Sequence, residues 1–453
     1  MEAVSSHKHH EEPLVFTGLG AITPLGLDVP TYWANLLQGK SGVQKITRFD
    51  ASPLPVQIAA EVPDFKPEDY FDQHLLKGTT LFMQFALAAA RQALAESALP
   101  LADLSNRIGV VFGSAMGGVT PIASMGQQYL ISKTKKVSPH FVPSVITNMG
   151  AAQAAIFFGL KGPSLTVQTA CSAGGDAILT AAMLLRSDFC DAVLIMGGES
   201  IVCDVAISSL AQAKALSRQN DDPQTACKPF DARRDGFVIG EGGGALVLEK
   251  LSQAQSRGAK PLAILAGYAN TMDAYHITAP DPEGLGAARC MRKALEIANI
   301  SPEDIGYINA HGTATLLGDM AETKAVKQVF GAKCPPISST KGATGHMMGT
   351  GGITEVLTCI LSLQHKILPP TINYAAQDPA CDLDYIPNTP REAEISVAMS
   401  NALGFGGQNS CIIVQAYWWW PKSPTFVWDW RFKGGHFLAF AWELRSFQAF
   451  ANI

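Results

Sequence analysis

Short apolar runs, typical of buried strands, alternate along this chain with longer runs that carry apolar residues at helical spacing. The sequence predicts ten strands, at residues 14–23, 107–115, 164–170, 191–199, 244–251, 262–271, 304–313, 335–344, 394–403 and 410–417. It predicts helices at 80–97, 177–188, 288–299 and 351–365. Such alternation indicates an α/β fold whose sheets are covered by helices.

The predicted strands divide into two successive sets of similar rhythm, which suggests an internal duplication. Residues 110–118 share a pattern with 307–315, and 166–175 share one with 337–346, although identity within each pair is low. A duplicated α/β fold brings loops from both halves to one cleft. The expected divisions are a tail at 1–13, an N-terminal half at 14–255, a C-terminal half at 256–417 and a second tail at 418–453.

Composition excludes several classes of protein. The 453 residues carry a formal net charge of -5 with no long basic block, which argues against general nucleic-acid binding. The nine cysteines are odd in number and include no CxxC pair, so neither a disulfide framework nor a zinc site is expected. A reducing compartment, the cytoplasm, is the expected location, with a plastid or mitochondrion open if a transit peptide has been removed.

The two ends of the chain carry little functional signal. The N-terminal tail lacks an apolar signal core, and its His7, His9 and His10 could form a metal tract or a solvated tail. Residues 418–453 hold six of the seven tryptophans and show no clear period. Their aromatic residues could contact a membrane or a partner, but we expect an atypical extension without membrane contact.

The run TVQTACSAGGD (166–176) places Cys171 where a predicted strand gives way to small residues. A tight turn there would expose the sulfur, and the N-terminus of a following helix would place partial positive charge beside it. Both effects favour the thiolate. Taken alone, Cys171 could equally be a small buried hydrophobe, as most free cysteines are.

Other chemical residues stand at comparable junctions. His311 follows a predicted strand, and Lys341 and His346 lie in a glycine-rich strand-to-helix junction. Residues 404–409, GFGGQN, bracket Phe405 with glycines, where the backbone must turn sharply or approach a ligand. A lone histidine is often structural, but two with a lysine at strand ends fit a shared cleft.

A cysteine with two histidines suggests a particular reaction. Two neutral imidazoles can each donate an N–H to a thioester oxygen and so favour an enolate at a second acyl group. Backbone N–H groups beside the thiol can hold the other oxyanion. This combination suits carbon–carbon bond formation between thioesters.

These motifs resemble the elongating β-ketoacyl-[acyl-carrier-protein] synthases, the condensing enzymes of fatty acid synthesis. The resemblance spans about residues 14–417. Its main landmarks are VFTGLGAITPLG (15–26), GPSLTVQTACSAGG (162–175), NAHGTATLLGD (309–319), SSTKGATGHMMG (338–349) and SNALGFGGQNS (400–410). It implies a duplicated thiolase-like fold with five layers, α-β-α-β-α, working as a homodimer.

The resemblance also implies catalytic roles. Cys171 would receive an acyl chain from the phosphopantetheine of an acyl-carrier protein. His311 and His346 would polarise a malonyl thioester and assist its decarboxylation. Lys341 would organise the electrostatics with Glu322 as its ionic neighbour, unless Glu322 is a plain solvated helix residue. No cofactor beyond the carrier's phosphopantetheine is implied.

Binding roles follow from the same resemblance. Phe405 would gate the second substrate, and its N–H would complete an oxyanion hole with that of Cys171. Thr313 and Thr315 would hydrogen-bond the pantetheine arm, unless they merely cap a turn. Met116 and Phe141 would line the acyl pocket, unless they are ordinary core residues.

Two further roles concern charged and oxygen-bearing groups. Lys135 and Lys136 would dock the acidic carrier protein, although they could be a plain solvated pair. The segments around Asn309, Glu355 and Ser400 could surround a structural monovalent cation; no metal is otherwise expected.

The sequence departs from the family pattern at two places. Ala314-Thr315-Leu316 replaces the usual Ser-Thr-Pro, and Asp176-Ala177 stands where relatives often carry histidine and a small polar residue. The second change affects packing under the nucleophile. Two alternatives stay open, a discrete polyketide ketosynthase and a catalytically silent partner subunit, although such partners usually lack the cysteine.

Overall fold

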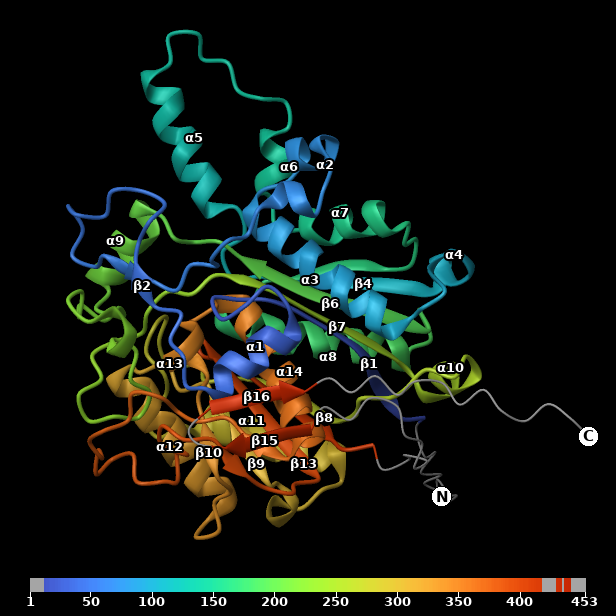
Figure 1. Cartoon of the computed structure of the whole chain (residues 1–453), viewed down its shortest axis with the longest axis vertical. Helices are drawn as coiled ribbons and strands as arrows, with labels where there is room; N and C mark the ends of the chain where they lie inside the picture. Colours follow the sequence, from blue (N-terminus) through green and yellow to red (C-terminus); the bar gives the residue numbers. More distant parts are fainter. Residues whose placement is uncertain (1–11, 418–428, 434–435, 441–453) are drawn as a thin grey trace, which may run out of the picture. The chain divides into compact units, whose positions relative to one another are not determined.

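The computed structural model describes residues 12–417, 429–433 and 436–440, and its main feature is a ladder of ten strands in the order β10-β9-β13-β14-β8-β1-β7-β6-β4-β5 (Figure 1). The strands of the first half are β1 (Leu14–Ile22), β4 (Ile108–Gly113), β5 (Ser164–Val167), β6 (Ala192–Glu199) and β7 (Gly242–Lys250). Those of the second are β8 (Ala263–Met272), β9 (Tyr307–Asn309), β10 (Ile337–Ser338), β13 (Val397–Gly404) and β14 (Gln408–Gln415).

The two halves repeat one topology. When the five strands of each half are numbered in chain order, they lie across the sheet in the order third, second, fourth, fifth, first. The second strand pairs in parallel with the third and the fourth, and the fifth pairs antiparallel with the fourth and the first. This repetition gives the duplication a geometric basis that the weak internal sequence similarity lacked.

The helices complete the layers. They are α1 (Val29–Leu37), α2 (Gln73–Gly78), α3 (Leu81–Ser97), α4 (Leu101–Leu104), α5 (Val119–Ile131), α6 (Phe141–Val145), α7 (Met149–Phe158), α8 (Ala173–Arg186), α9 (Asp204–Gln212), α10 (Leu251–Ser256), α11 (Leu285–Ala298), α12 (Leu316–Phe330), α13 (Lys341–Thr344) and α14 (Met348–His365). Three short strand pairs lie outside the main sheet: β2 (Gln44–Lys45) with β3 (Ile58–Ala59), β11 (Ile367–Leu368) with β12 (Arg391–Glu392), and β15 with β16 in the C-terminal tail.

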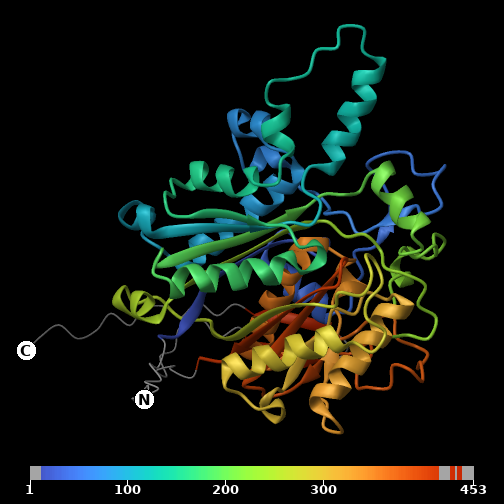
Figure 2. The ribbon, with the colours of Figure 1, turned by 180° about the vertical axis from the view of Figure 1, so that it is seen from behind.

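Helices α8 and α14 lie between the two halves of the sheet, whereas α3 covers the outer face of the first half and α11 that of the second (Figures 1 and 2). Within the ten-stranded sheet, the halves pair where Leu14–Phe16 of β1 meet Ala263–Leu265 of β8. Beyond these residues the halves separate and the central helices fit between them. The expected α-β-α-β-α layers are confirmed, with the addition that one ladder runs through both sheets.

Glycines set how closely the layers approach. A Cβ atom built on Gly18 or Gly20 of β1 would lie 2.0 or 1.9 Å from a carbonyl oxygen of α3, so only glycine lets the helix rest directly on the strand. Among the central helices, a Cβ at Gly174 would meet the Gly349 oxygen at 2.6 Å, and one at Gly352 would meet the Gly175 nitrogen at 2.8 Å. Helices α8 and α14 therefore cross in backbone contact close to their N-termini.

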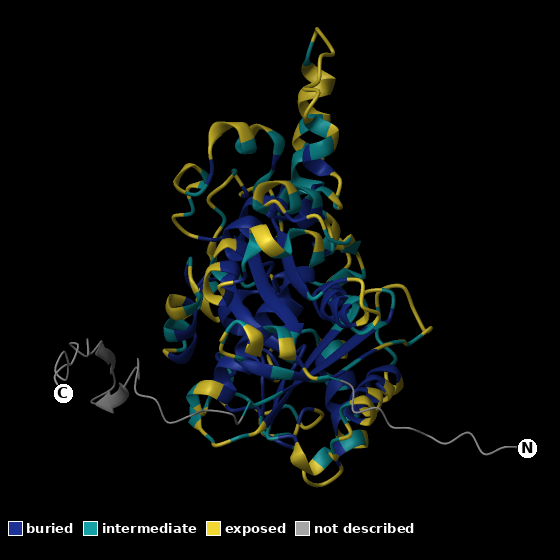
Figure 3. Ribbon diagram, turned by 90° about the vertical axis from the view of Figure 1, so that its right-hand side faces the viewer, coloured by how far each residue is buried: buried dark blue, intermediate teal, exposed yellow. Residues whose placement is uncertain are grey.

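Helix α5 and the loop at 132–140 form an arch that projects from the rest of residues 12–416 (Figures 1 and 3). The arch carries several large apolar side chains in contact with solvent, among them Leu130 at 78% exposed and Ile131 at 83%. Strand β5, at the edge of the sheet, is also partly exposed. Exposed apolar surface and an open sheet edge are each typical of an interface.

The chain divides into two compact units, residues 1–416 and 417–453. In the second unit the structure describes one antiparallel hairpin, β15 (Asp429–Lys433) with β16 (His436–Phe440). The rest of the tryptophan-rich tail lies outside the described residues, and so do His7, His9 and His10. The expectation that this tail makes no membrane contact therefore stays a prediction. Among the helices that are described, none combines the length and apolarity needed to cross a bilayer.

Candidate active site

The predicted catalytic residues meet where parallel strands of the two halves end. Cys171 lies in the short turn between β5 and α8, and His346 follows β10 and precedes α14. His311 comes after β9, and Phe405 directly after β13. Because α8 and α14 cross at glycines near their N-termini, the residues preceding these helices are brought together.

The nucleophile turn is strained. Residues 170–172 form a single 3-10 turn, and Ala170 adopts a left-handed φ of 51°. This conformation costs a residue with a Cβ roughly 1 kcal/mol or more. A Cβ at Gly404 would approach the Thr169 oxygen, the Cys171 nitrogen and the Ser172 nitrogen within 3.1 to 3.3 Å, so glycine at the end of β13 lets that strand lie against the turn.

One histidine contacts the thiol, and the second lies beside the first in the same cavity. His346 Nε2 lies 3.1 Å from Cys171 Sγ. The His311 and His346 rings are 5.3 Å apart between centroids and nearly perpendicular, at 83°. Neither Nδ1 atom has a hydrogen-bond partner among the described residues. The sequence prediction that one cysteine and two histidines share a pocket therefore fits the geometry.

The protonation state of the thiol differs from the expectation. Burial raises the pKa of Cys171 to about 12, outweighing the opposing effects of the Lys341 charge and of the Phe405 N–H that bonds to the sulfur. The Lys341 charge and the Phe405 N–H favour the thiolate, but burial has the larger effect. Cys171 rests as a thiol, and its proton must move as the sulfur attacks.

Both imidazoles rest neutral. Burial lowers the pKa of His311 and of His346 well below the usual value, and the positive charge of Lys341 lowers both further. A neutral imidazole can donate one N–H to a substrate oxygen or accept a proton from a thiol. Lys341 thus acts on Cys171, His311 and His346 together.

The expected partner of Lys341 needs correction. Its ammonium forms an ion pair with Glu355 on α14, not with Glu322, and both members of the pair are buried. Glu322 instead accepts the N–H groups of His311 and Gly312, each at 2.8 Å. Burial raises the pKa of the Glu322 carboxyl. Those two hydrogen bonds and the charge of Lys341 oppose the rise. Glu322 therefore fixes the backbone that carries His311.

Phe405 lies beside the nucleophile and is 39% exposed. Its N–H donates to the Cys171 sulfur, and the glycines after it, Gly406 and Gly407, have positive φ values of 85° and 77°. Only glycine adopts such a backbone readily. The local chain thus aims one amide at the reacting atom while leaving the aromatic ring at the surface.

A cavity of about 500 Å³ opens in front of Cys171, lined by Met116, His311, Thr313, Thr315, His346 and Phe405 among others. Thr313 and Thr315 are joined by a hydroxyl contact of 3.0 Å. Arg234 donates to the Thr315 and Leu316 carbonyls at 3.3 and 3.2 Å. The loop that replaces the usual Ser-Thr-Pro is therefore anchored through its backbone, despite the left-handed φ of 67° at Ala314.

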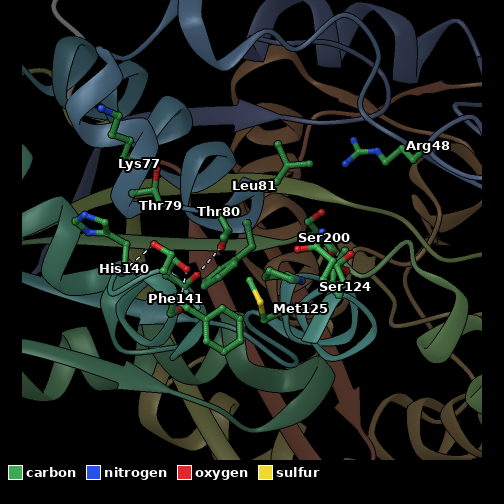
Figure 4. Close-up of a pocket in the computed structure, with 16 residues that line it drawn as sticks. Arg48, Lys77, Thr79, Thr80, Leu81, Ser124, Met125, His140, Phe141 and Ser200 are labelled. Carbon is green, nitrogen blue, oxygen red and sulfur yellow. Dashed lines mark hydrogen bonds between the residues drawn. The ribbon is translucent and has the colours of Figure 1, made fainter. Parts of the chain in front are cut away.

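Phe141 lies elsewhere. It lines a second cavity of about 490 Å³ between α3, α5 and α6, together with polar groups such as Lys77 and His140 (Figure 4). It is not among the residues that line the Cys171 cavity. Within one chain, Met116 alone of the two predicted acyl-pocket residues lines that cavity.

Comparison with known proteins decides the family. The N-terminal β-ketoacyl synthase domain matches residues 11–254 and the C-terminal β-ketoacyl synthase domain matches residues 262–375. The chain belongs to the β-ketoacyl synthase family. The expected class of enzyme, a condensing acyltransferase, is confirmed with it.

The curated relatives of this β-ketoacyl synthase include two bacterial enzymes. The chain is 43% identical over 407 residues to 3-oxoacyl-[acyl-carrier-protein] synthase 2 of Staphylococcus aureus (strain N315), covering 89% of this chain and 98% of that protein. It is 43% identical over 404 residues to the protein of the same name from Coxiella burnetii, covering 88% of this chain and 98% of that protein.

Solved structures share the fold. A β-ketoacyl synthase from Burkholderia phymatum is 32% identical with a TM-score of 0.84, over 90% of this chain and 100% of that one. The ishigamide ketosynthase/chain length factor is 34% identical with a TM-score of 0.85, over 90% and 99%. A type II polyketide ketosynthase in complex with its acyl-carrier protein is 33% identical with a TM-score of 0.81, over 90% and 99%.

Sequence reasoning missed Glu199, a buried carboxylate at the end of β6. It accepts the N–H groups of Ala115 and Met116, the Ser114 hydroxyl at 3.1 Å and the Gly349 N–H. Burial raises the pKa of this carboxyl to about 7, against the effect of these donors. Glu199 thus joins the turn that carries Met116 to the start of α14. A glutamate at the end of an otherwise apolar strand was the available signal.

The predicted docking lysines differ in their surroundings. Lys135 Nζ donates to the Tyr129 and Leu130 carbonyls at 2.7 and 3.2 Å and lies over the Tyr129 ring, so it stabilises the end of α5. Lys136 is exposed. Lys214, which sequence reasoning did not single out, is exposed and lines the Cys171 cavity.

Of the three residues suggested for a cation, Asn309 and Ser400 lie together, whereas Glu355 is paired with Lys341. Ser400 and Asn309 are register partners on adjacent strands, and the buried Asn309 Oδ1 has no hydrogen-bond partner among the described residues. Oxygen donors of this kind suit a hard monovalent ion, whereas the described residues contain no group of three or more His, Cys, Asp or Glu side chains able to hold a metal. The cysteines, all nine within residues 12–417, are unpaired.

Proposed function

We propose that this protein is an elongating β-ketoacyl-[acyl-carrier-protein] synthase of fatty acid synthesis. It would join a Cys171-bound acyl chain to the two carbons of malonyl-carrier protein with loss of CO2. The observation that carries this proposal is a thiol 3.1 Å from one neutral imidazole, with a second imidazole and a backbone N–H beside it.

The first stage is acyl transfer. The Cys171 sulfur attacks the thioester carbonyl of the acyl-carrier protein, and the thiol proton passes by way of His346 to the departing pantetheine sulfur. Because the pKa of Cys171 is raised, this transfer must accompany the attack. The N–H groups of Cys171 and Phe405 would hold the oxyanion of the tetrahedral intermediate.

The second stage is decarboxylation and condensation. Malonyl-carrier protein replaces the first carrier, and the N–H groups of His311 and His346 bond the oxygen of its thioester. Loss of CO2 leaves an enolate on that oxygen, and its carbon attacks the acyl-Cys171 carbonyl. The Cys171 sulfur leaves as a thiolate and regains a proton.

Thr313 and Thr315 stand where they could bond the pantetheine arm, because both line the cavity and present hydroxyls. Met116 would contact the acyl chain. Lys136 and Lys214 provide exposed positive charge for an acidic carrier protein. We further propose a homodimer, built through β5 and the apolar arch, in a reducing compartment such as the cytoplasm.

Experiment can distinguish two other candidate functions from the proposed one. The likeness to a type II polyketide ketosynthase favours polyketide extension as the second candidate. A silent partner subunit fits poorly with the assembled Cys171, His311 and His346.

Acyl- and malonyl-carrier proteins of graded chain length, with mass detection of the product, test the proposal. A single round of elongation giving a 3-ketoacyl-carrier protein is expected. Repeated extension without reduction would identify a polyketide enzyme, and no product at any length would contradict both. Cys171→Ala should abolish condensation while malonyl decarboxylation persists.

A further inference from the structure

Asp176 forms a hydrogen-bonded cluster beneath the nucleophile. It lies in the first turn of α8 and is 5% exposed. Its Oδ2 atom accepts the Thr169 hydroxyl at 2.5 Å and the Ser172 hydroxyl at 3.0 Å. Its Oδ1 atom accepts the Asn270 amide at 2.8 Å. Both carboxylate oxygens are therefore engaged by side chains outside the helix interior.

Two of these partners flank the reactive residue. Thr169 precedes and Ser172 follows the pair Ala170–Cys171, in which Ala170 has a left-handed φ. The Ser172 hydroxyl also contacts the Thr169 carbonyl at 2.7 Å, so the carboxylate closes a ring of hydrogen bonds across the base of the turn. A conformation of high local energy persists only when its surroundings hold it.

The third partner belongs to the other half of the fold. Asn270 lies on β8, the first strand of the second half, whereas Asp176 and its turn belong to the first. Gly404, also from the second half, lies against the same turn. The nucleophile turn is thus in contact with the second half at two places, one of them through Asp176.

We propose that Asp176 is a positioning residue for acyl transfer, which fixes the Cys171 N–H in the oxyanion hole. The inference rests on the proposed function and specifies one step of it. Asp176 touches the residues beside Cys171 and, among the hydrogen bonds of the structure, neither histidine. Its removal should therefore slow attack on a thioester carbonyl, which needs the oxyanion hole, more than reactions that do not.

The alternative role is structural. An aspartate in the first turn of a helix stabilises that helix through its dipole wherever it lies. In that role its loss would lower the stability and every reaction of Cys171 together. The two roles differ in the ratio of two rates measured on the same thiol.

The test compares acylation of Cys171 by an octanoyl thioester of pantetheine with its alkylation by iodoacetamide, which forms no oxyanion. In Asp176→Ala we expect acylation to fall about tenfold or more while alkylation changes less than about threefold. Asp176→Asn, which retains an acceptor and the side-chain shape, should recover much of the acylation rate. Intact mass follows both reactions.

Thr180→Val is the matched control, because Thr180 bonds the Asp176 carbonyl at 2.7 Å without touching the turn. It should leave the ratio of the two rates unchanged. Thr169→Val removes the shortest contact without stranding a charge, so it tests the same point if Asp176→Ala does not fold. Its acylation should fall more than its alkylation.

Two results would overturn the inference. They are equal loss of acylation and alkylation, or acylation within about twofold of the unsubstituted protein in both Asp176→Ala and Thr169→Val. Failure of the unsubstituted protein to accept an acyl group at all would instead contradict the proposed function.

Discussion

At the residue scale, one buried ammonium group organises the charges around the thiol. Lys341 pairs with Glu355, lowers the pKa values of both histidines and opposes the rise in the pKa of Cys171. The position of Lys341 in a glycine-rich junction indicated a site, but its partner could not be read from spacing. That partner depends on how α14 packs across α13.

Removing this charge should shift the pH dependence of decarboxylation. In Lys341→Met the pKa values of His311 and His346 should rise, because a neighbouring positive charge no longer disfavours their protonation. The neutral imidazoles would then be lost at higher pH, so the acidic limb of the pH–rate profile moves upward.

Lys366→Met removes a lysine from an exposed ion pair and should leave the profile unchanged. Circular dichroism establishes that both variants fold. An acidic limb that stays in place or moves to lower pH in Lys341→Met would argue against this electrostatic role.

At the element scale, the crossing of α8 and α14 brings Cys171 to His346. Gly352→Ala would place a Cβ 2.8 Å from the Gly175 nitrogen, and backbone cannot rotate away as a side chain can. We expect a loss of about 2 kcal/mol or more in the free energy of unfolding. Acylation of Cys171 should also fall about tenfold, because the helix ends move apart.

The neighbouring Gly351→Ala is its control. The nearest atom to a Cβ there is Glu355 Oε1 at 3.7 Å, an ordinary contact. Alanine at this helical position should be neutral or stabilising by up to about 1 kcal/mol. Urea denaturation measures both variants. Equal stability and activity of the two alanine variants would show that the crossing does not limit the site.

The sequence predicted the strands and helices better than it predicted how they pack together. All ten strands of the main sheet lie within or beside predicted runs, because their apolar residues mark burial directly. Helices α5, α7, α9 and α12 were not predicted, and α7, with MGAAQAAIFF, is apolar on most faces. The predicted run 335–344 contains only the two residues of β10 before α13 begins.

The site shows the same limit. Cys171, His311, Lys341 and His346 were identifiable because their residue types stand at strand ends among glycines. The roles of Glu199 and Glu322 depend on which backbone N–H groups face them, and that is set by packing. The raised pKa of Cys171 likewise follows from burial that local sequence does not reveal.

At the scale of the whole molecule, the arch and the β5 edge predict self-association. Ile131→Asp should weaken a dimer more than tenfold, since it places a carboxylate on the apolar surface. Ile297→Asp on α11, a residue 43% exposed elsewhere, is the control. Sedimentation across a concentration series measures both. A monomeric unsubstituted protein, or equal association of the two variants, would refute this interface.

The surface charges make a separate prediction about the carrier protein. Lys136→Glu should raise KM for acyl-carrier protein, because acidic partners are repelled, and leave acylation by a small pantetheine thioester within about twofold. Lys214→Glu should raise the same KM more than it slows the small thioester, whose cavity Lys214 also lines. Lys135→Glu should additionally destabilise α5, whose last carbonyls it bonds. An equal effect on both substrates would argue against docking at these lysines.

In the proposed mechanism Cys171 holds the acyl chain between the two stages. Incubating the protein with acyl-carrier protein in the absence of malonyl-carrier protein, followed by intact mass and peptide mapping, tests this role. We predict one acyl group for each chain, on the peptide that contains Cys171. An acyl group on another residue, or a Cys171→Ala variant that still forms the 3-ketoacyl product, would contradict the account.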